Sequence, residues 1–117
     1  MILAQIRMNC GEDREIATAL RALCAMTATR LGCRSCELHR GIDHPDQLLL
    51  LQQWNDWPSL TAHIHSDVFA QLLQILELSV DRPSLQFCQM TGARGLEFVE
   101  AVRLGTTQEE EPAAIRK

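Results

Sequence analysis

Residues 33–54, CRSCELHRGIDHPDQLLLLQQW, contain the pattern that decides the fold of this chain. In the middle of the segment, Pro45 lies between two nearby aspartates. Proline fixes φ and aspartate bonds its own backbone, so this group is typical of a turn. The flanking runs, 33–40 and 47–54, have the length of strands. We therefore predict a β-hairpin whose loop lies at about 42–46.

The segments before the hairpin change from a period of two to a helical period. Apolar and polar residues alternate over 2–8, which predicts a strand. Beyond Gly11, apolar residues recur every three or four positions as far as Leu31, which predicts an amphipathic helix of about five turns. Acidic residues in its first turn suit the positive end of the helix dipole, and Gly32 is placed to end it.

The segments after the hairpin predict two more helices and a further strand. Pro58 suits the first turn of a short helix at about 59–65, and Ser66 or Asp67 caps the next helix. A fourth strand follows at 85–90. The order is that of an α+β domain with an antiparallel sheet and the ferredoxin-like β-α-β-β-α-β topology.

The length of 117 residues suits one domain, which we expect over 1–104, with a core at 1–90 and an extension at 91–104. Residues 96–104 alternate well enough to predict a fifth strand, although their composition would also suit a helix. Residues 105–117 include three consecutive glutamates before a proline, and we expect them to form a flexible tail.

The run Leu48–Leu51 is apolar on both faces of its predicted strand. In a two-layer domain one face of the sheet meets helices and the other meets water, which produces alternation. The chain has no spare amphipathic element to cover the second face. We therefore expect a homodimer in which two copies pair through their sheet faces.

The composition excludes several classes of partner. The chain is 46% hydrophobic and 22% charged, with a net charge of −4. One lysine and ten scattered arginines form no basic stripe for nucleic acid. No apolar run approaches the roughly 20 residues of a membrane span. The start lacks the features of a secretory signal and the five cysteines are odd in number, so we expect a cytoplasmic protein with reduced thiols.

Three motifs in the order GCRSCELHR (32–40), LLLQQW (49–54) and LTAHIHSDVF (60–69) resemble the antibiotic biosynthesis monooxygenase (ABM) domain family. The family pattern runs GC-x-x-(aromatic)-E-L, then LL-(E/Q)-(E/Q)-W, then L-x-x-H-x-x-S-x-x-F. The resemblance covers about residues 1–90. It implies ferredoxin-like protomers that pair into a dimeric α/β barrel, with a pocket between sheet and helices in each protomer.

The resemblance also implies an activity: cofactor-independent monooxygenation of a small quinol or electron-rich aromatic. Fold membership alone does not settle the chemistry. One alternative is an isomerase of a small phosphorylated keto-sugar, which predicts Arg7, Arg34 or Arg40 in the pocket. Another is a non-catalytic small-ligand-binding or stress-response dimer, which predicts a buried His63 bonded to backbone.

The candidate catalytic residue is His63, which stands at the helix histidine of the family pattern. A neutral imidazole there could take a proton from a phenol or an enediol. Trp54 could stack on a flat substrate, and one of Gln52 and Gln53 should face the pocket, since the two point to opposite faces. The expected substrate-binding residues are Trp54, Gln52, Gln53, Arg7 and Phe69. A buried Arg7 would need a carboxylate partner, for which Glu37 is suitable.

Some residues depart from the family pattern or argue against a metal. Cys36 occupies the position that is usually aromatic and the chain has no tyrosine, which disfavours oxygenases that hold a phenol with tyrosines. Arg7, His63 and Leu72 stand where the haem-degrading branch has Asn, Trp and its axial His, so we reject haem degradation. The C-x-x-C pair formed with Cys33 sits in a strand, where an offset of three gives opposite faces, so we predict packing and no metal site.

Overall fold

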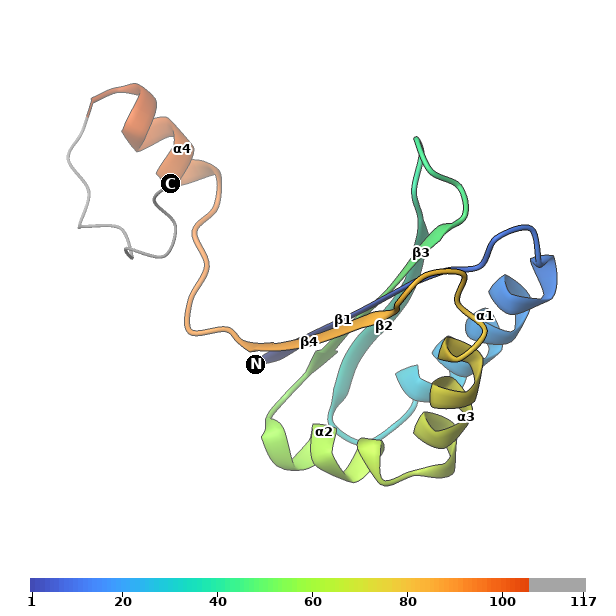
Figure 1. Ribbon diagram of the computed structural model, residues 1–117. Helices are drawn as coiled ribbons and strands as arrows, with labels where there is room; N and C mark the ends of the chain where they lie inside the picture. The colour runs from blue at the N-terminus through green and yellow to red at the C-terminus, as the bar shows by residue number, and fades with distance from the viewer. Residues whose placement is uncertain (106–117) are drawn as a thin grey trace.

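The computed structural model describes residues 1–105 of the chain as four strands and four helices. In chain order the elements are β1 (Ile2–Asn9), α1 (Arg14–Ala28), β2 (Cys33–Arg40), β3 (Gln47–Trp54), α2 (Trp57–Ile64), α3 (Asp67–Leu76), β4 (Ser84–Gln89) and α4 (Leu96–Arg103). The strands form one antiparallel sheet in the order β2-β3-β1-β4, and α1 and α3 lie on one face of it (Figure 1). The predicted α+β ferredoxin-like fold is therefore confirmed.

The alternation of the two central strands puts the core between the sheet and the helices. Every second residue of β3 from Leu48 to Trp54 is buried, and the same holds for β1 from Ile2 to Met8. The two strands pair antiparallel along their whole length, with Ile6 opposite Leu50. These side chains pack against the apolar stripes of α1 and α3, which closes the core on that face.

Local chemistry explains where the helices begin and end. Asp13 caps α1 by accepting a hydrogen bond from the Glu15 backbone N–H at 2.9 Å. The helix ends at Ala28, three residues earlier than predicted, and Gly32 lies in the turn into β2 with a φ of +87°. That left-handed conformation favours glycine. The Gly32 carbonyl accepts from the Asn55 N–H at 2.8 Å, which ties this turn to the start of α2.

The prediction of a fifth strand at 96–104 is wrong, because these residues form α4. A strand would need a sheet edge beside it, whereas α4 stands apart from the sheet on an extended connection (Figure 1). None of its side chains is buried, and Leu96, Val99 and Val102 are exposed. Apart from Gly105, the expected flexible tail at 105–117 lies outside the described residues.

The face of the sheet opposite α1 and α3 is here called the outer face. It includes the half-buried side chains of Leu3, Leu49 and Leu51, and no described helix packs on it (Figure 1). Leu48 and Leu50 are buried on the helix side, whereas Leu49 and Leu51 lie half-buried on the outer face, so the sheet-to-sheet dimer expected from the leucine run stays a prediction. None of the described helices has both the length and the apolar character needed to cross a membrane.

Candidate functional site

Four side chains meet where β3 ends beneath α2 and α3: Gln52, Trp54, His63 and Phe69, here called the aromatic cluster. All four are buried. The rings of Trp54 and His63 stack with centroids 4.8 Å apart and planes at 29°. Phe69 meets the imidazole edge-on, at 5.6 Å and 86°. The cluster therefore brings together four of the six side chains that the sequence nominated.

The local sequence explains how three elements meet there. Gln52 and Trp54 share the helix-facing side of β3 because they are two residues apart. Ser66 connects the helices that carry the other two: its hydroxyl donates to the His63 carbonyl at 2.6 Å and accepts from the Phe69 N–H at 3.3 Å. One serine thus ends α2, caps α3 and sets the imidazole beside the phenyl ring.

Two polar atoms in the cluster have no hydrogen-bond partner within the described residues: Gln52 Nε2 and His63 Nδ1. The Trp54 Nε1–H donates to Gln52 Oε1 at 2.9 Å, and an indole can only donate, so the oxygen end of the amide faces it. The amide nitrogen is left as an unused donor. An unpaired buried polar group costs about 1–3 kcal/mol, so each of these two atoms can still take a hydrogen-bond partner.

The protonation state of His63 follows from its surroundings. Burial, followed by the positive charge of Arg30, lowers its pKa to about 4. The imidazole is therefore neutral at pH 7, and one of its ring nitrogens is a proton acceptor. Sequence reasoning missed Arg30, which lies beyond the last turn of α1. Its influence on His63 depends on how α1 packs near α2, and no local pattern shows that.

Two nominated residues lie elsewhere. Arg7 and Gln53 point to the outer face, so the sheet separates them from His63. The expected buried pair of Arg7 with Glu37 is wrong, because Arg7 is exposed and Glu37 instead contacts His39, Oε1 to Nε2, at 3.0 Å. The period of a strand places Arg7 on that face, where none of the described helices covers it.

The cysteines form a packing group. A bulge between Cys33 and Ser35 turns Cys33 to the helix side, so the prediction of opposite faces for Cys33 and Cys36 is wrong. Cys24 donates to the Cys36 carbonyl at 3.0 Å, and burial raises the thiol pKa of both Cys33 and Cys36. Such thiols are poor nucleophiles. Within residues 1–105, no three His, Cys, Asp or Glu side chains are grouped to hold a metal ion.

Solved structures with the same fold come from several organisms. Rv0793 from Mycobacterium tuberculosis is 21% identical, with a TM-score of 0.71 over 80% of this chain and 98% of its own. A candidate antibiotic biosynthesis monooxygenase from Deinococcus radiodurans is 17% identical, with a TM-score of 0.68 over 82% and 98%. At these identities the likeness shows the fold alone. A comparison with curated proteins finds no match.

The family comparison goes further than the fold. The family model described as antibiotic biosynthesis monooxygenase matches residues 1–74, a stretch that includes β1 to β3, α2 and the whole aromatic cluster. This is more than half of the chain. The match and the shared fold together establish that this chain belongs to the antibiotic biosynthesis monooxygenase (ABM) family.

Proposed function

We propose that this protein is a cofactor-independent monooxygenase that acts on a small quinol or a related electron-rich aromatic. The observation that supports this most directly is the pair of unpartnered buried atoms, Gln52 Nε2 and His63 Nδ1. A phenolic hydroxyl is complementary to both, because it donates to a neutral imidazole nitrogen and accepts from an amide N–H. The aromatic faces of Trp54 and Phe69 suit a flat ring.

The proposed reaction needs no reductant other than its substrate. A quinol supplies four electrons to O₂: one oxygen atom enters the ring and the other leaves as water, so the product is a hydroxyquinone. His63 would accept the hydroxyl proton and so make the ring electron-rich enough to react with oxygen. Gln52 would hold the same oxygen by donating from Nε2.

The low pKa of His63 determines the free-energy cost of moving the phenolic proton to its imidazole. Complete transfer from a phenol with a pKa of about 10 to an imidazole with a pKa of about 4 costs about 8 kcal/mol. A turnover of about one per second corresponds to a barrier of about 17 kcal/mol, so this step fits within it. We therefore expect the proton to lie on the His63 imidazole only transiently, while the substrate ring transfers electrons to O₂.

The arrangement of the arginines is less suited to the isomerase alternative. Arg7 lies on the outer face, Arg34 reaches the Met1 sulfur at 3.5 Å, and Arg40 donates to the Pro45 carbonyl in the hairpin. The non-catalytic alternative expects His63 to be bonded to backbone, whereas its Nδ1 is unpartnered. The non-catalytic alternative becomes an outcome of the activity test below.

A second copy of the chain is the proposed cover for the outer face. The support is physical: Leu3, Leu49 and Leu51 form a half-buried apolar strip there that no described helix covers. Self-association through a common patch gives a closed two-fold dimer. We propose this homodimer as the functional unit.

The test is oxygen uptake by the full-length protein with a series of substituted hydroquinones, together with the absorbance of the hydroxyquinone product. We expect one O₂ consumed per quinol. His63→Ala should lower turnover by about a hundredfold or more, the usual contribution of a general base. His65→Ala is the matched control, because His65 is exposed two residues away and should leave turnover unchanged.

Two results would contradict the proposal. Equal turnover in His63→Ala and the wild type would remove His63 from the reaction. No turnover of any quinol, with a quinol nevertheless quenching the fluorescence of buried Trp54, would favour the non-catalytic alternative.

A further inference from the structure

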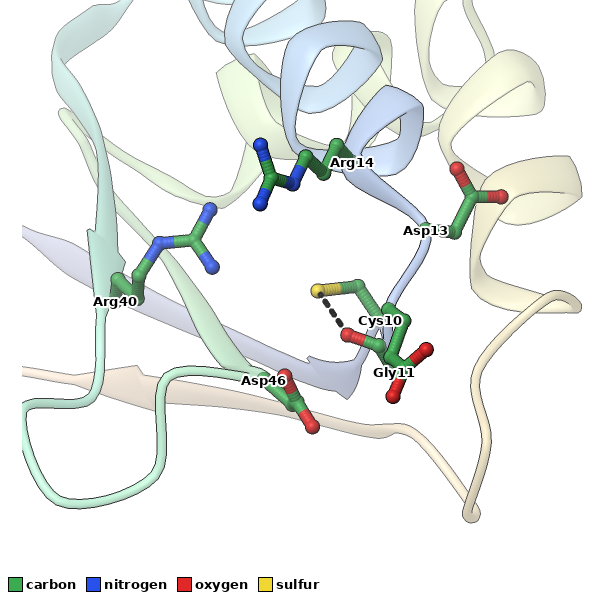
Figure 2. Close-up of a pocket in the computed structure, with 7 residues that line it drawn as sticks. Cys10, Gly11, Asp13, Arg14, Arg40 and Asp46 are labelled. Atoms are coloured by element: carbon green, nitrogen blue, oxygen red, sulfur yellow. Dashed lines mark hydrogen bonds between the residues drawn. The ribbon is translucent and has the colours of Figure 1, made fainter.

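A cavity of about 490 Å³ lies at the end of the sheet that is far from the aromatic cluster (Figure 2). Its walls come from the loop after β1, the first turn of α1 and the β2–β3 hairpin. Trp54 pairs with Ile2 and Leu48 with Met8, so the cavity lies about 20 Å along the strands from the aromatic cluster. Its volume is within the range of small-molecule sites.

Two guanidinium groups define one side of this cavity. Arg14 at the start of α1 and Arg40 at the end of β2 extend toward each other into it (Figure 2). Within residues 1–105 the one ion pair joins His39 to Glu37, so neither guanidinium has a carboxylate within 4.0 Å. Two like charges that face each other repel, and this arrangement is relieved by an anion between them.

The direction of these groups suits a particular kind of anion. The Arg40 guanidinium is held in place, because its Nη1 donates to the Pro45 carbonyl at 2.6 Å. The remaining N–H groups of a guanidinium form a planar fork that matches the oxygens of a carboxylate or phosphate. A fork that is already oriented loses less entropy when it binds.

The carboxylates of the cavity stand apart from the guanidinium side. Asp13 is turned away from the arginines and is occupied in capping α1, and Asp46 also points away from them (Figure 2). With Glu12 these groups give the cavity a second, negative side. A plain anion would meet repulsion there, whereas a hydroxyl or ammonium group would find acceptors.

We propose that this cavity is a second ligand site, distinct from the aromatic cluster. Its ligand is a small molecule with an oxyanion at one end, bound between Arg14 and Arg40, and hydroxyl or ammonium donors at the other, bound by Glu12 and Asp46. The oxyanion could belong to a zwitterionic amino acid or to a hydroxylated phosphate ester. The two sources share this chemistry, and the test separates them.

The test is titration of the isotope-labelled full-length protein, followed by the backbone amide signals of Gly11 and Arg14. The probes are glycine, glycerol 3-phosphate and inorganic phosphate, each at constant ionic strength. We expect saturable shifts with glycine or with glycerol 3-phosphate, and weaker binding of inorganic phosphate, which lacks the second set of donors.

Variants then assign the binding. Arg14→Gln and Arg40→Gln should each weaken binding of the preferred probe by about tenfold or more, as expected for loss of a charged hydrogen bond. Arg21→Gln, at an exposed position of α1, makes the same chemical change outside the cavity and should leave binding unchanged. Asp46→Asn should weaken binding of glycine more than that of inorganic phosphate.

Three outcomes would overturn the proposal: shifts that do not saturate with any probe, equal binding by the wild type and the Arg14→Gln/Arg40→Gln double variant, or shifts as large at distant Gly32 as at Gly11. Thermal unfolding of each variant, measured in parallel, shows whether a loss of binding reflects a loss of fold. Since quinol turnover by His63→Ala is measured separately, this site and the proposed function can fail independently.

Discussion

The indole N–H of Trp54 donates a 2.9 Å hydrogen bond to Gln52 Oε1, and this bond decides which end of a buried amide is free. Both side chains lie on the same face of β3, and both are almost completely buried. A buried donor that is left unused lowers stability. The Gln52 amide nitrogen is such a donor, and the proposed quinol hydroxyl would be an acceptor for it.

Gln52→Met tests whether the Gln52 amide contributes more to quinol turnover than to the free energy of unfolding. Methionine has nearly the same shape, so the core stays filled. The change removes the unpaired Nε2 but leaves the Trp54 N–H without its acceptor, and the two effects oppose each other. We expect the free energy of unfolding in urea to change by less than about 1 kcal/mol, while quinol turnover falls at least about tenfold.

Gln71→Met is the matched control, since Gln71 is exposed on α3 and should affect neither measurement. A large loss of stability in Gln52→Met with unchanged turnover would show that the amide is structural.

The depressed pKa of His63 predicts how stability depends on pH. The unfolded chain takes up a proton on this histidine near pH 6.5, whereas the folded protein does so only at about pH 4. Between these values the unfolded state binds more protons, so stability falls as the pH is lowered. We expect His63 to make the protein about 2 kcal/mol less stable at pH 5 than at pH 7, measured by urea unfolding.

His63→Gln should abolish this part of the pH dependence, and His65→Gln should retain it. Arg30→Gln should make the total loss smaller and end it at a higher pH, because removal of the neighbouring cation raises the folded pKa of His63, whereas the onset near pH 6.5 is set by the unfolded chain. An unchanged profile in His63→Gln would contradict the assignment of the low pKa to this residue.

Strand periodicity accounts for the parts of the site that could be predicted. Alternation along β3 is enough to show that Gln52 and Gln53 point to opposite faces, and packing of the helices decides that Gln52 is the buried one. The same alternation puts Arg7 on the outer face, but only the fold shows that Glu37, its suggested partner, contacts His39. Arg30 acts on His63 through tertiary packing, which leaves no trace in the local sequence.

Irregular geometry accounts for the errors. The bulge between Cys33 and Ser35 adds a residue to β2 and so changes the face to which Cys33 points, and no turn signal marks it. Residues 96–104 carry apolar side chains at spacings that fit either period. The outcome depends on whether a sheet edge is near, and α4 is held away from the sheet.

Gly32→Ala should weaken both the fold and the site. Its φ of +87° disfavours any side chain, and an added Cβ would overlap the Ser59 side chain at the start of α2. We expect a loss of at least about 1–3 kcal/mol in urea unfolding. Turnover should fall as well, because α2 carries His63.

Gly92→Ala is the control, as nothing lies within 4 Å of its added Cβ. A Gly32→Ala variant as stable as the wild type would mean that the turn between α1 and β2 can relax without cost.

Leu51→Lys tests the proposed dimer through the outer face. Leu51 lies in the middle of the apolar strip, opposite Gln5 of β1 and Glu37 of β2. In a two-fold dimer each substitution enters the interface twice, so two ammonium groups lose solvation together. We expect the wild type to be a dimer at micromolar concentration and the variant to dissociate at least about a hundredfold more readily, measured by light scattering after size exclusion.

Leu73→Lys makes the same change at an exposed position of α3, on the helix side, and should leave the dimer intact. A monomeric wild type would exclude sheet-to-sheet pairing, and a dimeric Leu51→Lys variant of unchanged affinity would place the interface on another surface. Because the aromatic cluster lies on the helix side of the sheet, a dissociated Leu51→Lys protomer that still turned over quinol would show that one protomer holds a complete site.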